Sequence, residues 1–197
     1  MNKKSMIIAG AVAAVVLLIT ATTMLSRSEK PMEDVKFGNT DKFAVFSTGR
    51  MHAKAKASRY LSEQAKKYEQ AMIKEYETEK AKLDKEGAEI AKQRGILSNE
   101  VYEKKGKEYL AKVDKFQKKF QEKELNLKKA IAAAFKNLEK TIQPILAEVV
   151  EKQQYRMVLN GDTGVIFYAQ KDDITDEIIE ALDDKVSKPD FEKPEGF

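Results

Sequence analysis

The sequence predicts an α+β protein that is mostly α-helical, with a small β body carrying a long antiparallel helical hairpin, a coiled-coil arm. The first observation is composition. Of 197 residues, 35% are charged and only 9 are Gly and 4 Pro, which favours long helices because Lys, Glu and Ala lose little on entering one. The second is periodicity. Apolar residues recur every three, four or seven positions through residues 50–153, whereas short strand-like runs flank that stretch.

Residues 1–25 predict export from the cytoplasm. Lys3 and Lys4 precede 21 uncharged residues, Ser5 to Leu25. As a helix this segment would span about 32 Å, enough to cross a bilayer core. It is typical either of a cleaved signal peptide or of a signal anchor that stays in contact with the inner membrane, and both place the chain after about residue 27 on the exported side. Residues 26–42 are polar and are predicted to be a linker.

The first strand and the first helix follow directly. Phe43–Phe46 is a short apolar run between polar residues, which favours a buried strand. Ser47 or Thr48 can cap a helix by accepting a backbone N–H. From about Arg50 to Arg94 there is no Pro and only one Gly, so one continuous helix is expected.

A reversal and a second long helix come next. Residues 95–99, Gly-Ile-Leu-Ser-Asn, combine a helix stop with a new N-cap. The second helix should run from about residue 99 to 153, with a bend near residues 140–144 because Pro144 removes a backbone hydrogen bond. A heptad-like apolar series in its second half predicts intimate packing. That series is Ile131, Phe135, Leu138, Ile142, Ile145 and Val149.

After the helices the period changes. Residues 155–159 and 165–169 are two apolar runs around an Asn-Gly turn, which predicts a β-hairpin. Residues 174–182 are predicted to form a short amphipathic helix. The expected body is residues 43–48 with 131–183, the arm is about 49–130 with its tip near 95–99, and residues 184–197 form an acidic disordered tail. Three short strands make a poor core for one chain, so oligomerisation through the heptad series is expected.

The residue types needed for chemistry are nearly absent. The sequence has no Cys, one His and no Gly-rich phosphate loop, so neither catalysis, nor a cofactor, nor a metal site is predicted. We expect His52, just after the first strand, to lie on the surface or to pack in the body rather than to act in catalysis. Residues 49–153 carry 25 basic and 17 acidic side chains, net +8, whereas residues 171–197 have a net charge of −6. A basic surface suits anionic partners.

This layout resembles the Skp (OmpH) family of periplasmic chaperones. The matching pieces are FAVFSTGR at 43–50, the charged hairpin, YRMVLNGDTGVIFYAQ at 155–170 and DITDEIIEAL at 173–182. The resemblance covers roughly residues 43–183. It implies a homotrimer in which three β bodies pack together and three arms surround a cavity. Family members hold unfolded outer-membrane proteins there without ATP.

The resemblance implies two sets of functional residues. Aromatic side chains of the arm would contact clients, and a basic cavity would also suit anionic lipid. The client-binding set is Tyr68, Tyr76, Tyr102, Tyr109, Phe116 and Phe120. The alternative for each of these aromatic residues is ordinary packing between the two helices of one arm. Apolar residues of the body would build the trimer. The trimer-body set is Phe43, Val45, Ile131, Phe135, Leu138, Ile142, Val149, Val158 and Ile166.

Other classes of protein share parts of this pattern. A membrane-anchored coiled-coil spacer of the cell envelope would have the apolar N-terminus and long charged helices, but it would form a thin rod rather than a hollow trimer. A nucleic-acid binder would use the basic arms, but export contradicts that function, and we expect no nucleic acid among the partners. A cytosolic hairpin chaperone of the prefoldin type has similar arms and no export segment.

Overall fold

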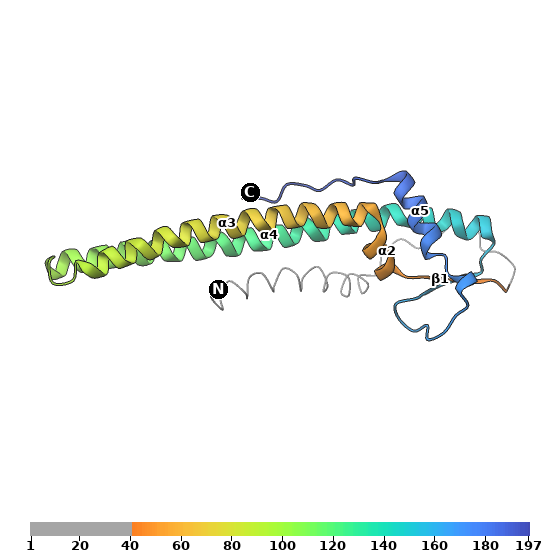
Figure 1. Ribbon diagram of the computed structural model, residues 1–197, viewed down its shortest axis with the longest axis horizontal. Helices are drawn as coiled ribbons and strands as arrows, with labels where there is room; N and C mark the ends of the chain where they lie inside the picture. The colour runs from red at the N-terminus through yellow and green to blue at the C-terminus, as the bar shows by residue number, and fades with distance from the viewer. Residues whose placement is uncertain (1–40) are drawn as a thin grey trace. The chain divides into compact units, whose positions relative to one another are not determined.

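The computed structural model describes residues 41–197, so the predicted export segment and most of the linker lie outside the described residues. The elements follow in the order β1 (Phe43–Phe46), α2 (Thr48–Lys54), α3 (Lys56–Lys92), α4 (Asn99–Gln153), β2 (Met157–Asn160), a 3-10 turn η2 (Gln170–Asp172) and α5 (Thr175–Lys185). They are shown in Figure 1. The prediction of a mostly helical chain with a small strand component is confirmed.

The described chain divides into two compact units. We call residues 41–64 with 131–192 the base, and residues 65–130 with 193–197 the arm unit. Both long helices contribute to each unit.

In the base, β1 and β2 form a two-stranded parallel sheet with Ala44 opposite Val158 and Phe46 opposite Asn160. The predicted hairpin is wrong, because residues 165–169 form no strand and β2 pairs with β1 instead. The turn that follows β2, residues 161–164, lies at the start of α2. There the Asp162 carboxylate accepts hydrogen bonds from Ser47 Oγ at 2.5 Å and from the Gly49 amide at 2.9 Å. These hydrogen bonds direct residues 165–169 away from β2, so they do not pair with it.

The start of the helical region also differs from prediction. Ser47 does cap α2, since its Oγ accepts from the Arg50 amide at 3.0 Å. The helix then stops at Ala55, whose ψ of 137° is extended, and α3 begins separately at Lys56. The Asp183 carboxylate of α5 accepts from the Lys56 amide at 2.7 Å. A partner from the far end of the chain thus satisfies the first amide of α3, a contact that local sequence does not contain.

The heptad series supplies the core of the base. Ile131, Leu138, Ile145 and Val149 are at most 7% exposed, and Ile178 and Leu182 of α5 are fully buried. α4 spans Asn99–Gln153 as predicted, with Pro144 inside it. These side chains are already buried within a single chain. The heptad series therefore forms the hydrophobic core of the base and leaves little of its surface for contact with other subunits.

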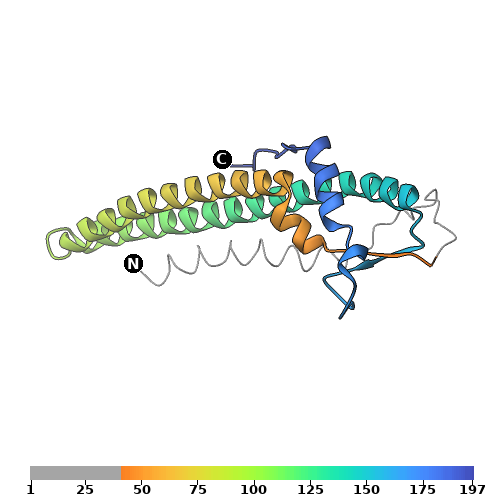
Figure 2. The same ribbon diagram turned by 45° about the vertical axis from the view of Figure 1, so that its right-hand side comes forward.

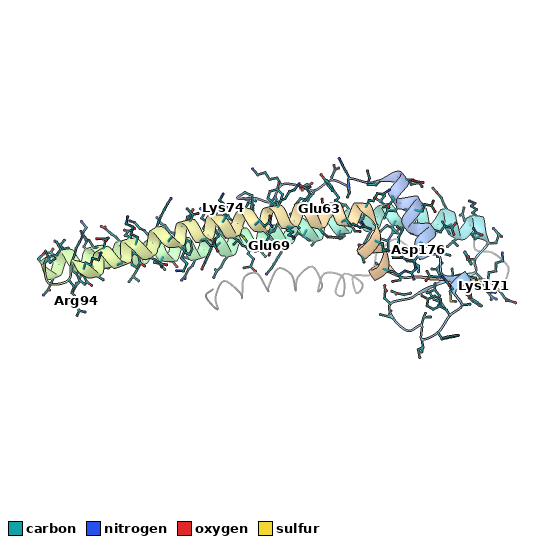
Figure 3. All side chains as sticks on the ribbon, viewed as in Figure 1. Glu63, Glu69, Lys74, Arg94, Lys171 and Asp176 are labelled. Carbon is teal, nitrogen blue, oxygen red and sulfur yellow. The ribbon has the colours of Figure 1, made fainter. Side chains whose placement is uncertain are left out.

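The arm unit is an antiparallel hairpin of α3 and α4, as Figures 1 and 2 show. The predicted reversal is confirmed: α3 ends at Lys92, α4 starts at Asn99, and Gly95 takes the left-handed φ of 86° that favours glycine. Arg94 lies at this turn (Figure 3). The tail differs from prediction, because residues 193–197 pack as part of the same unit instead of being disordered.

Candidate functional site

The middle of the arm contains a cluster of three aromatic rings. Tyr76 lies 5.0 Å from Phe116 and 5.1 Å from Phe120, and the two Phe rings are 4.9 Å apart, all between ring centroids. Phe120 is only 8% exposed, whereas Tyr76 and Phe116 are half-buried. The rings lock the two helices together, and two of them still present an edge to solvent.

Two of the remaining predicted client residues have specific local partners. The Tyr109 hydroxyl lies where a side chain at Gly87 would stand, only 2.8 Å from an ideal Cβ position. Gly87 is therefore the gap in α3 that lets the ring of Tyr109 cross the helix pair. Tyr68 contacts Phe197, with ring centroids 5.5 Å apart and the rings edge-to-face. Tyr102, near the start of α4, is half-buried.

A ladder of ion pairs connects the two helices of the arm. Lys119 Nζ lies 2.7 Å from Glu75 and 2.5 Å from Glu79, Lys123 pairs with Glu75, and Lys112 reaches Glu86 at 2.5 Å. The hydrogen bonds from Lys119 and then from Lys123 lower the pKa of Glu75, and the hydrogen bonds to Glu75 and then to Glu79 raise the pKa of Lys119. Charged pairs therefore replace much of the apolar seam that a globular core would have.

Large aliphatic side chains lie exposed along the arm, and the sequence analysis did not single them out. Leu125 is 52% exposed, Leu110 65%, Ile96 79% and Val101 42%. Ile96 lies in the reversal at residues 95–99, and Val101, Leu110 and Leu125 lie on α4 outside the apolar stripe. Their position off the stripe is the sequence signal that could have identified them. The arm hairpin, residues 65–130, carries 18 basic and 13 acidic side chains, net +5. Isolated apolar groups on a basic surface can make weak contacts with an unfolded chain but cannot hold it in one geometry.

The base exposes a second apolar surface, which we call the sheet-edge surface: Phe43, Met157, Leu159, Ile166 and Phe167. Ile166 and Phe167 are fully or almost fully exposed, at 101% and 93%. An open hollow of about 370 Å³ beside β2 is lined by Phe46, Val150 and Met157, among others. Phe43, Met157 and Leu159 lie on the two paired strands, and Ile166 and Phe167 lie on the loop that follows β2. Large exposed apolar residues of this kind are typical of interaction surfaces.

A polar network fixes the loop that bears Ile166 and Phe167. Arg50 binds the Asp173 carboxylate through two hydrogen bonds of 2.7 and 2.9 Å, and the Tyr168 hydroxyl donates to the same group at 3.0 Å. Burial of Asp173 acts to raise its pKa, but the hydrogen bonds from Thr175, Arg50 and Tyr168 outweigh it and lower the pKa to about 2. The loop is thus held at its far end by a carboxylate that stays ionised.

His52 lies in the base, with its ring 5.4 Å from that of Phe135 and its Nδ1 3.3 Å from Ser58 Oγ. Burial lowers the pKa of this imidazole, against the opposing effect of Asp162. Its neighbours are those of a packed side chain. Within residues 41–197 there is no group of His, Cys, Asp and Glu able to hold a metal ion. Over the same residues, no helix is apolar over a length sufficient to cross a membrane.

Comparison with known proteins identifies the family of this chain. The sequence profile of a family described as outer membrane protein (OmpH-like) matches residues 42–182, most of the chain. The chain belongs to the OmpH-like family. The resemblance to Skp and OmpH is thereby confirmed.

A solved structure shares the fold. It is that of an OmpH-like protein from Caulobacter crescentus, solved as a candidate outer membrane chaperone, and it superimposes with a TM-score of 0.73 at 19% sequence identity. The match covers 81% of this chain and 94% of the Caulobacter chain. No curated protein matches the sequence.

Proposed function

We propose that this OmpH-like protein is an ATP-independent holdase chaperone of the bacterial periplasm. It binds unfolded outer-membrane proteins and prevents their aggregation. The observation that carries the proposal is an arm whose helices are joined by charged pairs while single large aliphatic side chains point into solvent. The family of the chain and the chaperone description of the Caulobacter protein support the same role.

The proposed mechanism is dispersed weak contact. Half-buried Tyr68, Tyr76, Tyr102, Tyr109 and Phe116 offer ring edges, and Phe120 supports them from inside the arm. Burying apolar area contributes about 25 cal/mol per Å², so one such edge contributes little and many together retain a client. The net charge of +5 on the arm attracts acidic segments and anionic lipid headgroups. A client held in this way stays unfolded and can leave without ATP.

We further propose that three chains assemble through their bases, so that three arms surround a cavity. The sheet-edge surface suits this role, since Phe43, Met157 and Leu159 are 38–47% exposed and Ile166 and Phe167 are more exposed still. Val45 and the heptad series Ile131, Phe135, Leu138, Ile142 and Val149 are buried within each base and support that surface, and half-buried Val158 lines the open hollow beside β2. Phe43 and Ile166 are the most exposed members of the predicted trimer-body set, which supports a role for them in contacts with another subunit.

The test is the solution mass of residues 27–197 by light scattering, alone and with a denatured outer-membrane β-barrel protein. We expect a trimer that takes up one barrel chain and keeps it soluble. Ile166→Asp should lower the mass to that of a single chain, whereas Ile96→Asp, the same change on the exposed tip, should not.

A monomer or dimer that leaves the barrel protein to aggregate contradicts the proposal. The alternative, a membrane-anchored coiled-coil spacer, would then be favoured. The spacer has its own signature, because a thin rod has a larger frictional ratio than a hollow trimer of equal mass.

A further inference from the structure

The last residues of the chain lie on the arm. Residues 193–197 form one compact unit with residues 65–130, and Figure 1 shows the C-terminal end running alongside the hairpin. The Phe197 ring packs edge-to-face on Tyr68, and Lys123 Nζ lies 4.9 Å from the centre of the same ring. Pro194 is buried. The terminal ring is therefore gripped by an aromatic face and a cation.

The backbone of the tail is held as well. Asn126 Nδ2 donates to the Glu195 carbonyl at 3.4 Å, and the Phe197 amide donates to the Pro194 carbonyl at 3.4 Å. Gly196 has a φ of 87°, a conformation that a residue with a side chain rarely adopts. This turn bends the last residue back toward the helices, so the tail has a defined bound conformation.

The arm side of the contact contains a nearly buried lysine. Lys123 is only 7% exposed although it is charged, because Glu75 pairs with its ammonium group. Its stem faces the tail, with Cγ 3.5 Å from the point where a Cβ on Gly196 would lie. A lysine fixed by one partner presents its stem and charge as a ready surface to another. We call Tyr68, Lys123 and Asn126 the tail site.

We propose that the tail site is a peptide-binding site of the arm, and that residues 193–197 are a tethered competitor which unfolded client segments must displace. This inference rests on the proposed holdase function. The ligand class is a short, weakly acidic segment that carries an aromatic residue beside a turn. The chain's own tail has this chemistry, since residues 186–197 contain three acidic and two basic side chains and end in Phe.

Because the tail is tethered to the arm, even a small contact can regulate client binding. A short linker gives an effective concentration of order millimolar, so a weak site is filled by its own tail when no client is present. A single weak client segment does not open it. A long unfolded client contacts several arms and many residues at once, and its summed binding displaces the tail. The tail thus raises the threshold for capture and assists release.

The first experiment measures the tail site without any client. A fluorescent peptide of residues 188–197 is titrated with the full chain and with a chain ending at Glu192, up to millimolar protein, with anisotropy as the readout. We expect the shortened chain to bind the peptide at least about ten-fold more tightly than the full chain. Tyr68→Ala in the shortened chain should abolish binding, whereas Tyr60→Ala, a half-buried tyrosine in the base part of α3, should not.

Two outcomes overturn the inference. One is equal peptide affinity for the full and shortened chains. The other is no binding by the shortened chain at millimolar concentration, which is the concentration that the tether itself provides. Circular dichroism of each variant checks that the hairpin is intact.

The second experiment uses a client. Phe197→Ala in the full chain should increase affinity for a denatured outer-membrane β-barrel protein several-fold, and Ser187→Ala, at an exposed position outside residues 193–197, should leave it unchanged. Unchanged affinity in Phe197→Ala contradicts competition. If neither variant nor the parent prevents aggregation, the holdase proposal fails, while the peptide titration still decides whether the tail site binds.

Discussion

The base and the arm unit are built from the same two helices but held together by different forces. In the base, Leu138, Ile145 and Ile178 are at most 1% exposed, and side chains far apart in sequence cap helices and strands. In the arm the helices are joined by a small aromatic cluster and a ladder of lysine–glutamate pairs. Burial of apolar side chains fixes the conformation of the base. The arm unit has a smaller hydrophobic core, so more of its apolar and charged surface is available to partners.

The largest expected effect tests burial in the base. Leu138→Ala should lower the free energy of unfolding by about 2–5 kcal/mol, because it opens a cavity at a residue that is 1% exposed. Leu110→Ala, on the arm at 65% exposure, should change it by less than about 0.5 kcal/mol. Urea denaturation of both variants measures the contrast. Equal losses would show that the arm is as tightly packed as the base.

The next effect tests the carboxylate that fixes the base loop. The pKa of Asp173 is lowered from 3.8 to about 2, so its ionised form stabilises the fold above pH 3.8. That contribution, about 2 kcal/mol, is lost as the pH falls from about 4 to 2. Asp173→Asn should remove it at pH 7 and flatten the acid limb of the stability curve.

Asp176→Asn is the matched control for that variant, since its carboxylate is 71% exposed and makes longer contacts with Arg50 and Lys54. It should leave the acid limb unchanged. An acid limb that persists in Asp173→Asn would mean that another carboxylate governs the acid unfolding of the base.

A smaller effect tests the charge ladder of the arm. Glu79→Gln should weaken pairing with Lys119 and lower stability by about 1 kcal/mol or less, because both side chains are partly exposed and their attraction is screened by salt. The effect should shrink between 0.05 and about 1 M salt, as thermal unfolding at both concentrations would show. Asp84→Asn, whose Lys80 partner lies on the same helix, should have almost no effect.

The smallest effect tests the gap at Gly87. Ala is favoured over Gly by about 1 kcal/mol inside a helix, but a Cβ here meets the Tyr109 hydroxyl at 2.8 Å. Gly87→Ala should therefore change stability little, as the gain is offset by displacement of the ring. Gly106→Ala, with nothing within 4 Å of the new Cβ, should stabilise by about 0.5–1 kcal/mol. A Gly87→Ala variant as stabilised as Gly106→Ala would show that Tyr109 moves freely.

Local patterns predicted the parts of the fold that local interactions determine. The cap at Ser47, the reversal at Gly95 and the bounds of α4 depend on neighbouring residues, and all three are confirmed. The break at Ala55 is accompanied by a hydrogen bond from Lys56 to Asp183, and the path after β2 by hydrogen bonds from the start of α2 to Asp162. Each of these contacts joins residues more than a hundred positions apart. No periodicity encodes such contacts.

The candidate site was predicted in kind rather than in detail. The aromatic residues of the arm were identified, but periodicity could not separate buried Phe120 from half-exposed Phe116, four residues apart on one helix face. Exposed Leu110 and Leu125 were missed because they lie off the apolar stripe. The tail was expected to be disordered because its composition is polar, and the pairing of Phe197 with Tyr68 follows only from the three-dimensional arrangement.

The parallel pairing of β1 with β2 has a consequence for the order of folding. Ser47 and Asp162 hydrogen-bond across 115 positions of sequence, and both long helices lie between them. Closing so long a loop is entropically costly while the chain is unstructured, whereas helices form from local contacts in microseconds. The helical hairpin of α3 and α4 should therefore form first. Its formation brings the segments of β1 and β2 closer together before they pair. During synthesis, β1 therefore cannot pair until β2, which lies in the last third of the chain, has been made.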